Sequence, residues 1–281
     1  MERSVPLSNL PRFAHVVDRP ESSVNLGEGA LLIAEDAYPG LDVDAYLQRI
    51  DEIAEPAREK VRADSSLLEM VQTLNGHLFG ELGFQGNAQD YYDPRNSYLN
   101  EVLDRRLGIP ISLSVLYMEV ARRVGLTVVG IGLPGHFIVE ARRDTSSLLL
   151  DPFSGGELLT LEDCERLVQD VYGDSVAFSE DLLAPLRKRQ ILTRMLNNLK
   201  KSYLTADEPA RAWPIVEKMV FLDPENAVDR RDRGLLAHRL NQFGLARSDL
   251  RFYLDRRPDA PDRVAIQASL SAIEAILQMM A

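Results

Sequence analysis

The stretch from Leu107 to Phe153 constrains the fold of this chain more than any other. Its first part, LGIPISLSVLYMEVARRVGL, has apolar residues at helical spacing and includes Gly125 as a helix terminator. Its second part holds three apolar runs, separated by turn signals at Pro134-Gly135 and at residues 143–146. The pattern predicts a small antiparallel sheet backed by a helix that begins at Ser112.

The chain before this stretch is expected to be helical after an irregular start. Residues 1–24 contain Pro6, Pro11 and Pro20 and little periodicity, so they are predicted to form an irregular arm. Apolar spacing and capping residues predict helices over residues 26–36, 43–62, 66–78, 98–107 and, beyond the sheet, 160–172.

From about Leu186 onward only helices are predicted, and the sequence repeats. The spacing of 34 residues separates Pro224 from Pro258 and Ala212 from Ala246. Two blocks result, roughly 193–226 and 227–260, followed by a final helix near 261–279. A period of 34 is typical of the tetratricopeptide helix pair.

The eighth place of each block bears on how closely its two helices approach. Gly234 occupies it in the second block, whereas the first block has Lys200 where a small residue is usual. The match to the tetratricopeptide pattern is therefore partial. Stacked units of this kind leave a concave face for a protein or peptide partner.

The charge of −11 is unevenly distributed, which bears on the class of partner. Residues 1–185 contain 15 Lys and Arg against 31 Asp and Glu, whereas residues 186–281 contain 17 against 12. Nucleic acid is a disfavoured partner for so acidic a chain. The basic surface expected from Arg230, Arg231, Arg233, Arg256 and Arg257 is either solvated or able to bind an acidic peptide tail.

Several classes of protein are disfavoured by composition. The single cysteine, Cys164, excludes an intrachain disulfide, and His15, His77 and His238 have no metal-ligand spacing. No phosphate loop is present, so neither a cofactor nor a metal is predicted. Without a secretory signal or an apolar stretch long enough to span a bilayer, the chain is expected to be cytoplasmic and not in the membrane.

Three polar residues of the central stretch are candidates for a catalytic site. Ser112 at the helix start, His136 on the next strand pair and Asp151 after it have the order nucleophile, base and orienter. A helix start also provides free N–H groups for developing negative charge. The structural alternative is that Ser112 caps the helix, His136 packs in the sheet and Asp151 closes a turn.

Other polar and aromatic residues have weaker functional interpretations. Tyr91, Tyr92 and Tyr98 are expected either to line a groove beside these residues or to pack in the core. Asn96 and Asn100 are candidates to donate to a bound carbonyl, and the structural alternative is that they cap a helix or brace a loop.

The chain resembles the SirB-type family, which is named after the first of the SirB proteins. This family is a branch of the transglutaminase-like superfamily. The resemblance is carried by GIPISLSVLYMEVARRVGL, GLPGHFIVEA and LLLDPFSGG, which follow one another in order. It extends to LLIAEDAYPGLDVDAYLQRID, to GFQGNAQDYYDPRNSYLNEVLDRRLG and to the trailing tetratricopeptide-type helices, and so covers residues from about 30 to 260.

The resemblance implies a papain-like core in which a cysteine at a helix start is followed by a histidine and an aspartate on adjacent strands. His136 matches the histidine of the PGHF motif, and Asp151 matches the aspartate of the DP motif. The cysteine is missing. Ser112 is placed at its position, with Ser114 as the second choice, because Cys164 lies beyond the aspartate.

The sequence therefore predicts a mostly helical α+β protein. Residues 1–185 are expected to form a SirB-type, transglutaminase-like domain, and residues 186–281 a tetratricopeptide-like array. A binding or regulatory protein with a degenerate site is the first hypothesis, because a serine hydroxyl is a far weaker nucleophile than a thiol. The second is an acyl-transfer enzyme that uses a Ser112–His136–Asp151 triad on an amide or peptide bond.

Overall fold

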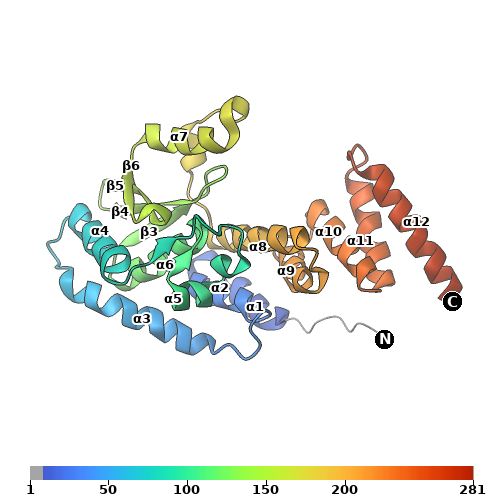
Figure 1. The fold of residues 1–281 in the computed structure, drawn as a ribbon, viewed down its shortest axis with the longest axis horizontal. Helices are drawn as coiled ribbons and strands as arrows, with labels where there is room; N and C mark the ends of the chain where they lie inside the picture. The colour runs from blue at the N-terminus through green and yellow to red at the C-terminus, as the bar shows by residue number, and fades with distance from the viewer. Residues whose placement is uncertain (1–8, 281) are drawn as a thin grey trace. The chain divides into compact units, whose positions relative to one another are not determined.

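The computed structural model describes residues 9–280, which form two compact units (Figure 1). One unit comprises residues 16–195; the other comprises residues 9–15 and 196–280. The boundary predicted after Pro185 lies ten residues before this division. The chain is mostly helical with a small antiparallel sheet and a helical C-terminal region, so the predicted α+β class is confirmed.

The first unit contains six complete α-helices and all of the strands found in residues 9–280. Its helices are α2 (Leu26–Ala34), α3 (Val43–Lys60), α4 (Leu67–Asn75), α5 (Leu99–Arg105), α6 (Pro110–Arg123) and α7 (Leu161–Tyr172). Its strands are β1 (Gln85–Gly86), β2 (Leu107–Gly108), β3 (Thr127–Ile131), β4 (Ile138–Arg143), β5 (Ser146–Asp151) and β6 (Glu157–Leu159).

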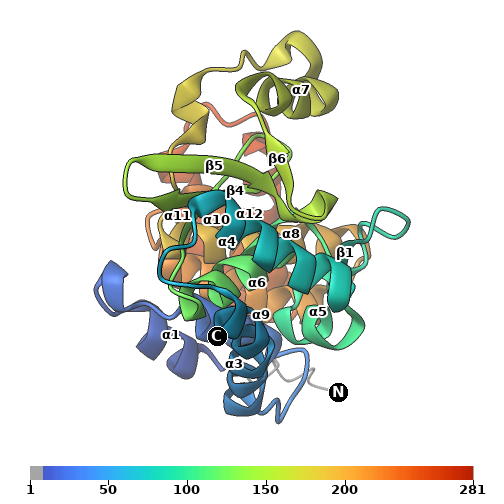
Figure 2. The ribbon, with the colours of Figure 1, turned by 90° about the vertical axis from the view of Figure 1, so that its left-hand side faces the viewer.

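The four-stranded sheet has the order β3-β4-β5-β6, and every neighbouring pair is antiparallel. Helices α4 and α6 lie on one side of the sheet and α7 on the other (Figure 2). Cys164 and Val168 of α7 join Ile131, Leu133 and Ile138 in one apolar cluster. Cys164 is therefore a core thiol.

Local capping explains several helix boundaries. Ser66 and Glu69 form a reciprocal capping box at the start of α4, and Thr160 and Asp163 do the same for α7. Helix α6 begins at Pro110, two residues before the predicted Ser112, because proline is favoured in the first turn, where its missing N–H has no partner to lose.

Residues 10–17 correct the prediction of an irregular arm. They form the helix α1 (Leu10–Val17), with Phe13, Val16 and Val17 buried. Pro11 is the second residue of this helix, so it is tolerated there for the same reason as Pro110. Residues 1–8 of the predicted arm lie outside the described residues. The short strands β1, β2 and β6 were also not predicted, because two or three residues show no periodicity.

The C-terminal region consists of α8 (Lys188–Thr205), α9 (Pro209–Leu222), α10 (Ala227–Arg239), α11 (Phe243–Arg256) and α12 (Arg263–Met280). Gly234, the small residue at the eighth place of the second block, allows two helices to approach closely, as the repeat pattern predicts. A Cβ atom on Gly234 would lie 2.8 Å from Leu250 Cδ2 and 3.2 Å from Asp249 Cβ, so α10 and α11 approach closely there.

Lys200, the exception to the small-residue pattern, is accommodated by ion pairs. Its Nζ donates to Asp229 Oδ1 and to Asp232 Oδ2, both at 2.9 Å, and its side chain is 13% exposed. Burial opposes the charge of Lys200, but the two carboxylates outweigh burial and raise its pKa. Electrostatic pairing thus replaces close helix contact at this position.

The basic surface predicted on these helices is largely neutralised within the chain. Arg230 and Arg233 both donate to the fully buried Asp249, and Arg231 donates to Asp232 and Asp262. Arg256 pairs with Glu225. Over residues 9–280, no helix is long and apolar enough to cross a membrane.

Candidate functional site

His136 and Asp151 are brought together by the pairing of β4 with β5. The Pro134-Gly135 turn places His136 just before β4, and Asp151 ends β5. His136 Nε2 lies 2.9 Å from Asp151 Oδ2, and the two side chains are 13% and 3% exposed. The ring is thus half-buried at the surface, with a buried carboxylate behind it.

The Asp151 carboxylate is fully engaged. Phe153 N donates to Oδ1 at 2.9 Å, and Ser154 Oγ donates to Oδ2 at 2.9 Å. Burial opposes ionisation, but the hydrogen bond and charge of His136 and these two donors outweigh burial and lower the pKa of Asp151. An ionised Asp151 accepts from Nε2–H of His136, which leaves Nδ1 of a neutral ring as an acceptor.

Ser112 is the third residue of α6, and its hydroxyl is committed elsewhere. The residue is fully buried, and Oγ donates to the carbonyl oxygen of Asn96 at 2.5 Å. Oγ also accepts from Ile109 N at 3.1 Å. Within residues 9–280, no hydrogen bond joins Ser112 to His136. The structure therefore brings together His136 and Asp151 and connects Ser112 to Asn96.

Asn96 is a brace for the loop that precedes it, the second of the two roles predicted for it. Its Nδ2 donates to Asp90 O at 2.7 Å, and its Oδ1 accepts from Asn87 Nδ2 at 3.1 Å. Ser112 fixes the Asn96 carbonyl, so it helps to hold residues 87–96 against the start of α6. The sequence showed a turn-rich loop but not which residue anchors it.

The alternative nucleophiles are no better placed. Ser114 is fully buried, and its hydroxyl has no hydrogen-bond partner among the described residues. Cys164 is fully buried as well, and burial, with the charges of Asp163 and Asp151 adding to it, raises the pKa of its thiol to about 11. A thiol of that pKa is protonated near neutral pH and is a poor nucleophile.

Aromatic rings extend from His136 to the surface. The Phe153 ring meets the His136 ring edge-on at 6.1 Å, and Tyr91 meets Phe153 edge-on at 6.1 Å. Tyr91 in turn meets Tyr92 at 5.4 Å. Tyr98, the third predicted tyrosine, is buried against Tyr38 and does not join this group.

Arg194 of α8 holds the turn that carries His136. Its Nη2 donates to the carbonyl oxygens of Leu133 and His136, each at 2.5 Å, and its guanidinium lies over the Phe137 ring at 5.6 Å. A Cβ atom on Gly132 would lie 2.6 Å from Nη1, so glycine makes room for the guanidinium. This contact could not be predicted from sequence patterns, because 58 residues separate Arg194 from His136.

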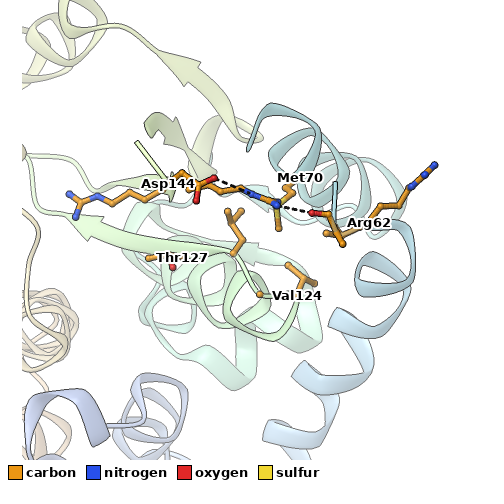
Figure 3. A pocket seen from close by; sticks show the side chains of 11 residues that line it. Arg62, Met70, Val124, Thr127 and Asp144 are labelled. Carbon is orange, nitrogen blue, oxygen red and sulfur yellow. Dashed lines mark hydrogen bonds and ion pairs between the residues drawn. The ribbon is translucent and has the colours of Figure 1, made fainter. Parts of the chain in front are cut away.

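A cleft of about 630 Å³ lies at the other end of β4 (Figure 3). It is lined by parts of residues 61–70, 124–127 and 142–144, and Arg143 reaches across it to Ala63 O at 2.9 Å and Met70 Sδ at 2.8 Å. A strand rises about 3.3 Å per residue, so this cleft is roughly 20 Å from His136. Its shape is therefore no guide to the chemistry of the His136–Asp151 pair.

Comparison with known proteins identifies the family. Residues 44–197 match the model of the transglutaminase-like superfamily, and residues 199–271 match a tetratricopeptide repeat model. A UPF0162 protein of Xylella fastidiosa (strain 9a5c) is 38% identical over 252 residues, which are 89% of this chain and 90% of that protein. The chain belongs to the transglutaminase-like superfamily and to the UPF0162 family. Its UPF0162 relatives do not carry the SirB name, so the narrower SirB-type assignment stays a prediction.

The similarity extends beyond the UPF0162 proteins. The human F-box only protein 21 is 29% identical over 223 residues, which are 69% of this chain and 34% of that protein. Among solved structures, the superposition with menin covers 97% of this chain and 72% of the menin chain, with a TM-score of 0.46 and 10% sequence identity. Both His136 and Asp151 fall within the residues that match the transglutaminase-like model.

Proposed function

We propose that this chain is a binding or regulatory protein in which the transglutaminase-like core no longer performs acyl transfer. The observation that carries the proposal is the state of Ser112. Its hydroxyl is fully buried and donates to Asn96 O at 2.5 Å. Acyl transfer needs a nucleophile that a base can deprotonate and a carbonyl carbon can reach, and Ser112 meets neither condition.

The C-terminal helices support a binding role. Residues 199–271 match a tetratricopeptide repeat, a class of array whose extended surface is used for protein interaction. The arginines of α10 are occupied by Asp249, Asp232 and Asp262, so we no longer expect them to bind an acidic tail. The partner surface of the repeats is expected on other side chains.

The alternative is a serine-dependent acyl-transfer enzyme that uses Ser112, His136 and Asp151. One observation favours it: His136 Nε2 lies 2.9 Å from Asp151 Oδ2, so the nitrogen that would act as a base is Nδ1. For this alternative the Asn96 hydrogen bond must break and α6 must expose Ser112 when substrate binds.

The two functions predict different results with a serine-reactive fluorophosphonate probe. A binding protein is expected to show no labelling of Ser112 in a peptide map, and any background labelling should be equal in wild type and His136→Ala. Ser114→Ala is the matched control for loss of a buried hydroxyl on the same helix. Labelling of Ser112 that disappears in His136→Ala would establish the enzyme.

The binding function is tested separately by copurification. We expect tagged full-length chain, cross-linked in cells, to recover the same partner protein in wild type and in Ser112→Ala. Reproducible recovery of no protein above an untagged control would count against a binding role, whatever the labelling result.

A further inference from the structure

Arg194 carries a charge that no carboxylate among the described residues neutralises through an ion pair. Over the described residues 9–280, its hydrogen bonds go to the Leu133 and His136 carbonyls, and no carboxylate forms an ion pair with it. The arginines of α10 differ, because Arg230 and Arg233 both pair with Asp249. Half-buried charges in proteins are usually paired, so the missing anion calls for an explanation.

The free donors of Arg194 face solvent. A guanidinium has five N–H donors, and the two carbonyl contacts occupy Nη2 alone. Nε and Nη1 of Arg194 form no hydrogen bond with the described residues. They are also not buried atoms, so both are accessible to solvent. Burial lowers the pKa of Arg194, opposed by nearby Tyr172 and Tyr91, yet an arginine side chain stays protonated. The site thus offers a partly desolvated cation whose remaining donors are accessible and have no hydrogen-bond partner among the described residues.

An aromatic surface surrounds this cation. Tyr91 and Tyr172 lie near the guanidinium, and the surface is extended by Phe153 and Tyr92, which contact Tyr91; Tyr91, Tyr92 and Tyr172 are 37%, 71% and 43% exposed. Tyr91, Tyr92 and Phe153 form the row of edge-on rings that ends at His136. Tyr172 ends α7, the helix whose Val171 lies against Gly135 beside His136.

The combination of tyrosines and an arginine is typical of protein-binding surfaces. Tyrosine and arginine are enriched among the residues that dominate binding energy at protein interfaces. Arginine matches the planar geometry of a carboxylate and donates two parallel hydrogen bonds to it. The unit that holds Arg194, residues 16–195, has 30 acidic against 17 basic residues, so its net charge disfavours a multiply charged anion.

We propose that Arg194 and the aromatic surface bind a single carboxylate, presented by an otherwise uncharged peptide segment of a partner protein. The inference rests on the proposed binding function and names the chemistry of its partner. The guanidinium would receive the carboxylate, and the tyrosine rings would cover the flanking residues. The peptide segment of the partner would then bind where a substrate would bind in an enzyme, but it would not be cleaved.

The test is a phage-displayed heptapeptide library panned against the full-length chain. We expect enriched peptides to carry one Asp or Glu flanked by neutral residues. For one enriched peptide, replacing its acidic residue with the amide should weaken binding by roughly tenfold or more in fluorescence anisotropy, because charge-assisted hydrogen bonds are about twice as strong as neutral ones. Enrichment without an acidic residue would overturn the proposal.

The variants assign the binding to this site. Arg194→Gln should weaken binding of the acidic peptide by roughly tenfold or more and leave the affinity for the amide form of the peptide unchanged. Arg58→Gln, which alters an exposed arginine of the same unit, should change neither by more than about twofold. Equal binding of the acidic peptide to wild type and Arg194→Gln would refute the inference.

Two further measurements distinguish loss of binding from misfolding of the variant, and a single carboxylate from a doubly charged anion as the ligand. Tyr92→Ala alters a side chain that is 71% exposed, so it should weaken the peptide without disturbing the His136 imidazole resonances in NMR. If inorganic phosphate displaces the peptide better than acetate, the site takes a doubly charged anion and the proposal is wrong. A partner that copurifies unchanged with Arg194→Gln would refute this inference and leave the proposed function standing.

Discussion

Ser112 and Ser114 lie two residues apart on α6 and are both fully buried. The Ser112 hydroxyl connects α6 to the Asn96 carbonyl, whereas the Ser114 hydroxyl has no partner among the described residues. A buried hydroxyl stabilises a fold only if it is hydrogen-bonded, because its desolvation cost is otherwise not offset. The hydroxyl of Ser112 is therefore expected to stabilise the fold, whereas the hydroxyl of Ser114 is not.

We predict that Ser112→Ala lowers the free energy of unfolding by about 1–3 kcal/mol, since the Asn96 carbonyl keeps only the longer hydrogen bond from Ile109 N at 3.4 Å and Ile109 N loses Oγ as an acceptor. Ser114→Ala, the matched control, should be neutral or slightly stabilising. Urea denaturation of both variants measures the difference. Equal destabilisation by the two substitutions would remove the structural role assigned to Ser112.

Asp151 gives a prediction in pH. Its pKa is lowered in the folded chain, so its carboxylate stabilises the fold above the unfolded pKa. That contribution is lost as the pH falls through the lowered folded pKa. The difference in unfolding free energy between wild type and Asp151→Asn should therefore be constant from pH 7 to about 5 and shrink below about 4. The exposed Asp144→Asn is the control, and a difference that persists at low pH would contradict the linkage.

At the scale of elements, the helices of the repeat region are held together in two different ways. Gly234 lets α10 approach α11 at Leu250 and Asp249. Lys200 fills the equivalent place of the preceding block with a charge that is paired to Asp229 and Asp232. One contact is steric and the other electrostatic, so they should respond to different substitutions.

We expect Gly234→Ala to destabilise the chain by roughly 1–3 kcal/mol, because the new Cβ atom would lie 2.8 Å from Leu250 Cδ2. Gly244→Ala on α11 is the matched control. Nothing lies within 4 Å of the Cβ atom it would add, so it should be stabilising by up to about 1 kcal/mol. Thermal unfolding of the two variants would show opposite shifts, and shifts of the same sign would argue against close packing at Gly234.

At the scale of the whole molecule, the chain divides into two compact units with cores of their own. Residues such as Leu133, Ile138 and Cys164 are buried in one, and Leu236, Ala237 and Leu250 in the other. Units with separate cores open separately in native-state hydrogen exchange. A lesion in one unit is therefore expected to be felt mainly there.

Lys200→Met tests this independence. Removing the ammonium leaves the buried Asp229 without its cation, whereas Asp232 keeps Arg231; loss of one partner of a buried pair typically costs about 3–5 kcal/mol. Amides of α10 and α11 should lose protection from hydrogen exchange, while those of β4 and β5 keep theirs. Equal loss of protection in β4 and β5 would mean that the two units unfold as one.

Much of this organisation could be predicted from the sequence, because it depends on local patterns. Helical spacing defined α3 and α6, the Pro134-Gly135 turn defined the β3–β4 connection, and the 34-residue period defined the repeat. The residues of the His136–Asp151 pair were named for the same reason, since each ends a recognisable strand or turn.

Contacts between distant residues were decided only by the tertiary structure. The sequence by itself determined which helices, strands and turns form, because periodicity and capping act over a few residues. It did not determine that Ser112 donates to Asn96, that Arg194 holds the His136 turn, or that the arginines of α10 are already paired. Hydrogen bonds and ion pairs of this kind form between side chains and backbone that only packing brings together, and here they connect Ser112 to Asn96 and leave His136 paired with Asp151 alone among the described residues.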